Sequence, residues 1–188
     1  MNLSGERGVD PFLQADLVFQ QMKVEGITPL PVNLVAEVYG ALQIDRISSP
    51  AQAALVCDLL HCDGLILTTV TTYDTYNPPK LGAAMQLFMK PTTFVRPPNV
   101  DPRELARRAT PEKVAPMPEG VDMVQVVGMF DAINGSVRDR LHRFAMGRSE
   151  KSGPLGEKEY YVVMDRYCEF AYTELIEQLL QSPKLKAL

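Results

Sequence analysis

Apolar residues along this chain recur with two different periods, and these periods separate predicted helices from predicted strands. Apolar residues that recur every three or four positions predict five longer helices. The fourth of these helices begins at Asp131 or Asn134. A short further candidate is DPRELARRA, at residues 101–109. Three of the five longer helices are expected at about 11–25, 33–43 and 50–63. The fourth runs from Asp131 or Asn134 to the turn that begins at Ser149, and the fifth is expected at about 157–181.

Two of these helices begin with specific local signals. Asp10 precedes Pro11, which is the arrangement of an N-cap residue followed by proline at the first helical position. Ser49 and Pro50 show the same arrangement. The Gln52 side chain can in addition accept a hydrogen bond from a backbone N–H at the start of this helix. The first helix has its apolar positions at Ala15, Val18, Phe19 and Met22. The last helix has them at Tyr161, Met164, Cys168, Ala171, Leu175 and Leu179.

Short apolar or alternating runs predict four strands, at 27–31, 65–73, 81–89 and 121–130. Pro29 predicts that the segment at 27–31 is an edge strand or the end of a strand. The order of elements predicts a strand–helices–strand crossover followed by an antiparallel pair. We therefore expect an α/β (α+β) domain with a mixed sheet of about four strands and helices packed on it.

Length and composition favour one globular domain over residues 11–181, with a disordered start at 1–10 and a tail at 182–188. Apolar residues make up 46% and charged residues 22% of the chain, which is ordinary for a globular protein. The net charge of −4 favours neither nucleic acid nor an anionic membrane as partner. No run of residues is apolar for long enough to predict a membrane span, and the polar first residues do not form a signal peptide.

Candidate catalytic and metal-binding residues are few. Cys57 and His61 are four residues apart on a predicted helix, but Cys62 points elsewhere and no second pair completes a zinc site. The other histidine, His142, lies in an arginine-rich helix, and no nucleophile motif or phosphate loop accompanies it. We expect no metal, no cofactor and no catalytic residue, and we expect Cys57, Cys62 and Cys168 to be unpaired.

A cluster of basic residues near the fourth long helix could in principle meet an anionic partner. Asp139 interrupts this cluster, so a solvated helix face is the favoured interpretation. The cluster consists of Arg138, Arg140, Arg143, Arg148 and Lys151.

The segment YDTYNPPKLG, residues 73–82, is the most distinctive connector in the chain. Its two consecutive prolines exclude a helix and favour an extended backbone, while Asp and Asn side chains can hold a turn. Three interpretations are open: a rigid strand connector, a protein-contact surface with outward tyrosines, and a catalytic loop. The candidate contact residues are Tyr73, Asp74, Tyr76, Asn77, Pro78, Pro79 and Lys80.

This segment also resembles a family of uncharacterised bacterial envelope lipoproteins of planctomycete type. The resemblance extends over most of residues 25–181 and includes ISSPAQAALV upstream and the last long helix downstream. Such proteins are similar in fold to the amino-terminal domain of TolB and to the curli-secretion lipoprotein. The matching residues are Asp63, Val70, Thr71, Tyr73, Tyr76, Pro78, Pro79, Lys80, Gly82, Gln86 and Leu87.

The resemblance implies a non-enzymatic, periplasmic or envelope-associated module that binds a protein partner or self-associates. No lipobox cysteine or export signal is present near the start of this chain, which departs from the family pattern. The alternative is a cytoplasmic enzyme or small-ligand-binding protein with a pocket near residues 73–80.

Overall fold

The computed structural model describes residues 1–24, 26–89, 122–148 and 154–186, and it combines helices with an antiparallel sheet. The α+β class expected from the sequence is therefore confirmed. The short helix expected at 101–109 lies outside the described residues. The longer helices are α1 (Pro11–Gln21), α2 (Val32–Leu42), α3 (Pro50–Leu60), α5 (Gly135–Gly147) and α7 (Met164–Leu180). The short helices are η2 (Gly156–Lys158), α6 (Glu159–Val162) and α8 (Pro183–Lys186), the last of which lies in the expected tail.

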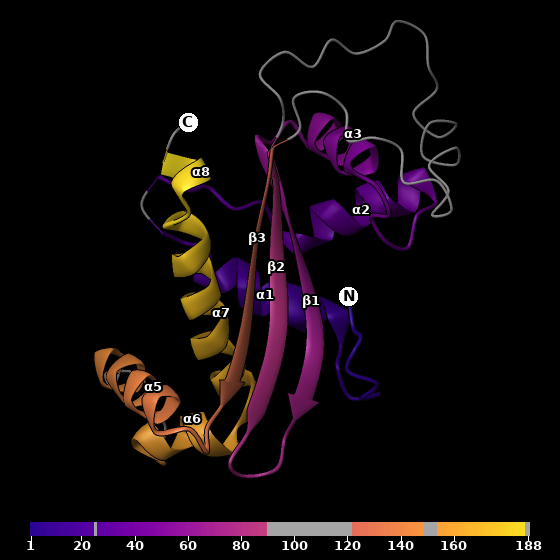
Figure 1. The fold of residues 1–188 in the computed structure, drawn as a ribbon. Coiled ribbons are helices and arrows are strands. Elements are labelled where there is room, and N and C mark those ends of the chain that lie inside the picture. Colours follow the sequence, from indigo (N-terminus) through magenta and orange to yellow (C-terminus); the bar gives the residue numbers. More distant parts are fainter. Residues whose placement is uncertain (25, 90–121, 149–153, 187–188) are drawn as a thin grey trace, which may run out of the picture. The chain divides into compact units, whose positions relative to one another are not determined.

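Three strands form the sheet, in the order β1 (Gly64–Asp74), β2 (Lys80–Met89) and β3 (Asp122–Asp131) (Figure 1). The fourth strand expected at 27–31 was wrong, because the structure assigns no strand there. Pro29 and Pro31 supply no backbone N–H, so this short segment lacks donors that a strand needs. Without it, the expected strand–helices–strand crossover is not formed by the described residues.

The amino-terminal residues differ from the disorder expected over 1–10. Asn2 forms a parallel bridge with Val70 of β1. The Val70 N–H donates to the carbonyl of Met1 at 2.9 Å, and the Leu3 N–H donates to the carbonyl of Val70 at 2.7 Å. The start of the chain thus adds a short strand segment to the free edge of β1, an arrangement that no alternation in the sequence indicates.

The chain divides into two compact units that share the three strands. The first unit contains Met1–Pro29, Thr68–Met85 and Val126–Leu188, and the second contains Leu30–Leu67 and Gln86–Gln125. The single domain expected over residues 11–181 stays a prediction, because each strand has one part in each unit.

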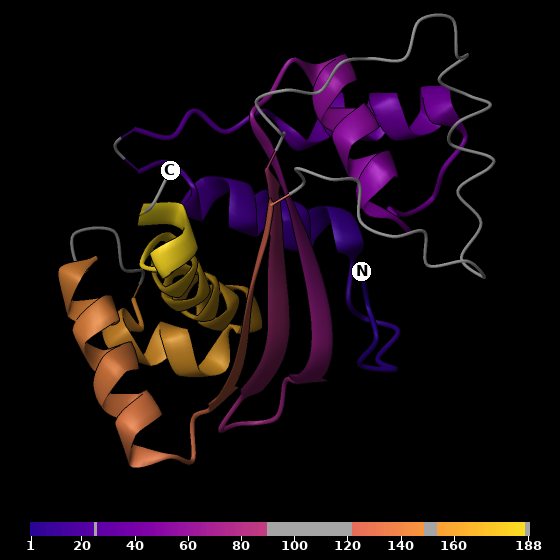
Figure 2. The same cartoon turned by 45° about the horizontal axis from the view of Figure 1, so that its top comes forward.

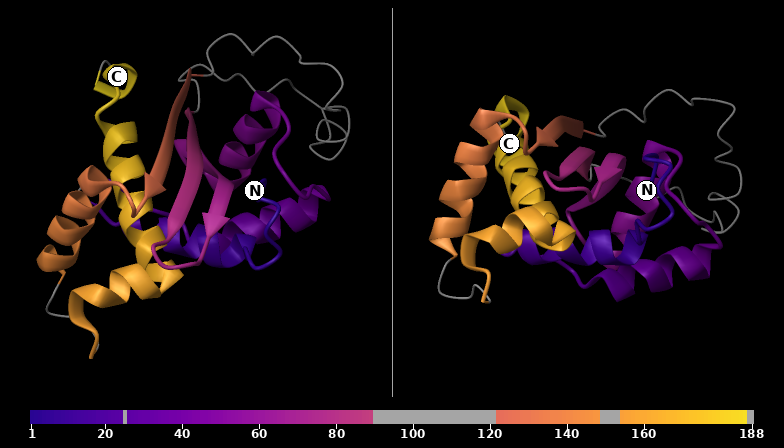
Figure 3. Two further views of the ribbon diagram at one scale, coloured as in Figure 1. Left: turned by 60° about the horizontal axis from the view of Figure 1, so that its bottom comes forward. Right: turned by 90° about the horizontal axis from the view of Figure 1, so that it is seen from below.

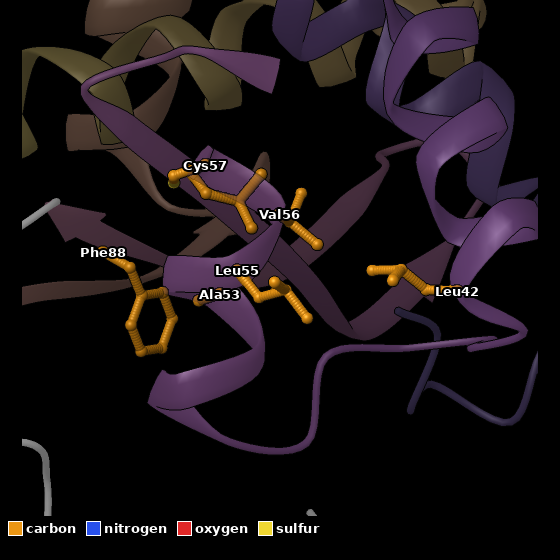
Figure 4. Close-up of a cluster of buried hydrophobic side chains, with 7 residues drawn as sticks. Leu42, Ala53, Leu55, Val56, Cys57 and Phe88 are labelled. Carbon is orange, nitrogen blue, oxygen red and sulfur yellow. The ribbon is translucent and has the colours of Figure 1, made fainter. Parts of the chain in front are cut away.

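In the second unit, α2 and α3 surround a hydrophobic core. Figure 4 shows Phe88 of β2 beside Ala53, Leu55 and Cys57 of α3. Helix α3 begins as predicted, since the Ser49 side chain accepts a hydrogen bond from the Gln52 N–H. The complete buried cluster is Leu42, Ala53, Leu55, Val56, Cys57, Leu65 and Phe88.

In the first unit, α7 lies along one face of the strands, and α1 packs against α7 (Figures 2 and 3). The α7 side chain of Phe170 is at the centre of this packing. Its ring meets Phe130 of β3 and Phe144 of α5 edge-on, with 5.7 Å between centroids in both pairs, and Tyr167 at 5.9 Å. This aromatic cluster joins β3, α5 and α7.

The face that α1 buries is not the one that its apolar residues predict. The buried positions include two glutamines, Gln14 and Gln21. Gln14 accepts a hydrogen bond from the Tyr172 hydroxyl of α7, and Gln21 accepts from Arg148 at 2.6 Å and Thr173 at 3.1 Å. Partners on other elements thus satisfy the amide oxygens of both glutamines.

The helix predicted over 157–181 is interrupted. Val163 has an extended backbone, with φ −107° and ψ 110°, and this separates α6 from α7. The break lets Tyr160 of α6 pack edge-on against Phe144 of α5, with ring centroids 5.6 Å apart. Two adjacent β-branched residues, Val162 and Val163, favour an extended backbone at this point.

Candidate functional site

The candidate site is the hairpin loop of residues 75–79, between β1 and β2. At its start, the Asp74 carboxylate accepts a hydrogen bond from the Tyr76 N–H at 3.0 Å, as expected for an aspartate that holds a turn. The peptide bond between Asn77 and Pro78 is cis. Pro79 is buried, and its carbonyl accepts from the Ala132 N–H at 3.1 Å. Both ends of the loop are therefore fixed by hydrogen bonds.

An ion pair supports the loop where β2 begins. Lys80 Nζ lies 3.1 Å from Asp131 Oδ2, at the end of β3. The other oxygen of Asp131 accepts from the Ile133 N–H at 2.9 Å. This backbone hydrogen bond, followed by the contact with Lys80, holds the pKa of Asp131 below its usual value. Lys80, one of the candidate contact residues, is therefore half-exposed and held in an ion pair.

The seven predicted contact residues divide into exposed and supporting groups. Tyr76 is 83% exposed, and Asn77 and Pro78 are exposed beside it. Asp74, Pro79 and Lys80 hold the loop through the contacts given above. Tyr73 is half-buried, and burial, assisted by Cys168 and Asp165 of α7, raises its pKa to about 12. Tyr73 is therefore partly shielded from solvent, and among the seven residues only Tyr76 presents an exposed ring.

The sequence did not predict three exposed apolar side chains on and beyond β3: Val127, Met129 and Ile133. They are 63%, 60% and 59% exposed. A Cβ added to Gly82 would lie 3.0 Å from Met129 Cε and 2.8 Å from Thr71 Oγ1, so Met129 and Thr71 share one sheet face. Val127, two residues before Met129 on β3, points to the same face. The alternation of Val127 and Met129 in the sequence was a signal for this face. We call Tyr76, Val127, Met129 and Ile133 the exposed patch.

The other candidate residues do not assemble into a site. Cys57 is buried, His61 is exposed at the end of α3, and Cys62 donates to the Gly64 carbonyl at 3.4 Å. None of the three cysteines, all of which lie in the described residues, forms a disulfide bond. Among residues 1–24, 26–89, 122–148 and 154–186, no group of three or more metal-ligating side chains comes together.

Acidic partners neutralise much of the predicted basic cluster. Arg140 lies 3.2 Å from Glu174, and Arg148 lies 3.8 Å from Glu169 while stacking on the ring of Phe144. His142 also faces a carboxylate, that of Glu157, at 2.8 Å. Lys151 lies outside the described residues. This pairing agrees with the interpretation of a solvated helix face.

Comparison with models of known protein families, with curated proteins and with solved structures finds no match to this chain. The resemblance to envelope lipoproteins therefore stays a prediction. Within the part of the chain that the structure describes, no helix combines the length and apolarity that crossing a membrane requires.

The Asp131 carboxylate gives a pH-dependent prediction. Because its folded-state pKa is lowered, its contribution to stability is present above the unfolded pKa and is lost as pH falls through the folded value. Asp131→Asn should lower the melting temperature at neutral pH, and the difference from wild type should shrink below about pH 4. Thermal unfolding from pH 2 to 8 measures this, with Asp16→Asn, an exposed carboxyl on α1, as control. A difference that is constant over this range would contradict the assignment.

Proposed function

We propose that this chain is a non-enzymatic protein-interaction or assembly module of the bacterial cell envelope. Its partner is another protein or a second copy, and the loop of residues 75–79 with the exposed patch is its contact surface. The observation that carries the proposal is the 83% exposure of Tyr76 on a loop fastened at both ends.

A fixed, exposed tyrosine suits protein recognition for two reasons. Its ring offers a large amphipathic surface with only two rotatable side-chain bonds, so little conformational entropy is lost on binding. Tyrosines are also enriched among residues that dominate binding energy. Val127 and Met129 on β3 and Ile133 beyond its end add exposed apolar area. A monomer gains no stability from exposing such area.

Tyr76→Ala tests the contact surface. We expect thermal stability to change by less than about 0.5 kcal/mol, because exposed substitutions rarely matter for folding. We expect association to weaken about tenfold or more, as for a binding hot spot. Sedimentation velocity measures self-association, and capture of solubilised envelope proteins on immobilised protein measures binding to other partners.

The matched control is Phe12→Ala, which removes another exposed aromatic ring of the same unit, at 63% exposure on α1. This variant should retain both association and stability. If Tyr76→Ala unfolds the protein while association is unchanged, the loop is a structural connector and the proposed contact surface is wrong. Equal weakening by both variants would show that contacts are not specific to the loop.

The proposed location is tested separately, by fractionating cells that express the natural gene. Release of the protein with the periplasmic or membrane fraction is the expected result. Recovery with the cytoplasmic fraction would contradict the location without affecting the test of Tyr76.

A further inference from the structure

We draw no further inference here: the strongest candidate, the uncharged sheet face that Val127 and Met129 of β3 form beside Gly82, belongs to the contact surface already proposed, and nothing in the structure shows what covers it.

Discussion

Replacing Phe170 by alanine should destabilise the protein by about 3–5 kcal/mol, the range for removing a large aromatic ring from a packed core. Phe170 is 0% exposed and contacts the rings of Phe130, Phe144 and Tyr167. The neighbours come from β3, α5 and α7 itself, so no single element can move to fill the cavity. Urea unfolding followed by circular dichroism measures the loss as a lower midpoint with an unchanged slope.

Two variants on the same helix make this result interpretable. Gln178→Ala changes an exposed residue of α7 and should stay within about 0.5 kcal/mol of wild type. Phe170→Leu keeps most of the apolar volume and should cost clearly less than Phe170→Ala. If alanine and leucine destabilise equally, the aromatic contacts rather than the filled volume are decisive. A Phe170→Ala protein as stable as wild type would contradict the described core.

The sequence predicted those features of the fold whose causes are local. Helix starts at Asp10 and Ser49 were predicted because the capping side chain and the proline are adjacent to the helix that they begin. Asn134, one of two residues predicted to start α5, is its N-cap. On α7, spacing alone identified four buried positions correctly, because the opposite side of this helix is polar. These are Cys168, Ala171, Leu175 and Leu179.

Features that depend on distant partners were not predictable. The inward face of α1 was misjudged because Gln14 and Gln21 are polar by sequence, and only Tyr172, Thr173 and Arg148 make their burial favourable. The spacing of apolar residues also predicted an unbroken last helix through Val163. In the structure the helix breaks there, and α6 packs on α5.

The same distinction applies to the candidate site. Asp74 and the prolines predicted a held turn with an exposed Tyr76, which the structure contains. The roles of Lys80 and Tyr73 depend on Asp131 and on α7, which lie far along the chain, so the sequence could not assign them. The two-residue spacing of Val127 and Met129 places them on one face of β3, but the sequence did not indicate that α7 covers the opposite face.

Deleting residues 157–188 should abolish cooperative folding. This truncation removes α7, which contributes eight buried residues to the first unit and covers the inward face of α1. Each large apolar side chain contributes about 1.5–3 kcal/mol on burial, and a domain of this size is stable by only about 5–15 kcal/mol in total. The burial free energy lost with several such side chains is therefore larger than the remaining core can offset. We expect insoluble protein, or soluble protein without a thermal transition.

The control is a chain that ends at Gln181, which keeps α7 and removes Ser182, α8 and the residues after it. It should melt within a few degrees of the full-length protein, because α8 is a four-residue helix at the end of the chain. Thermal unfolding of both truncated chains, followed by circular dichroism, measures the difference between them. A chain ending at Gly156 that melts like the full-length protein would show that the apolar face of α7 is dispensable for folding. We would then infer that this apolar face packs against a second subunit or has no packing role.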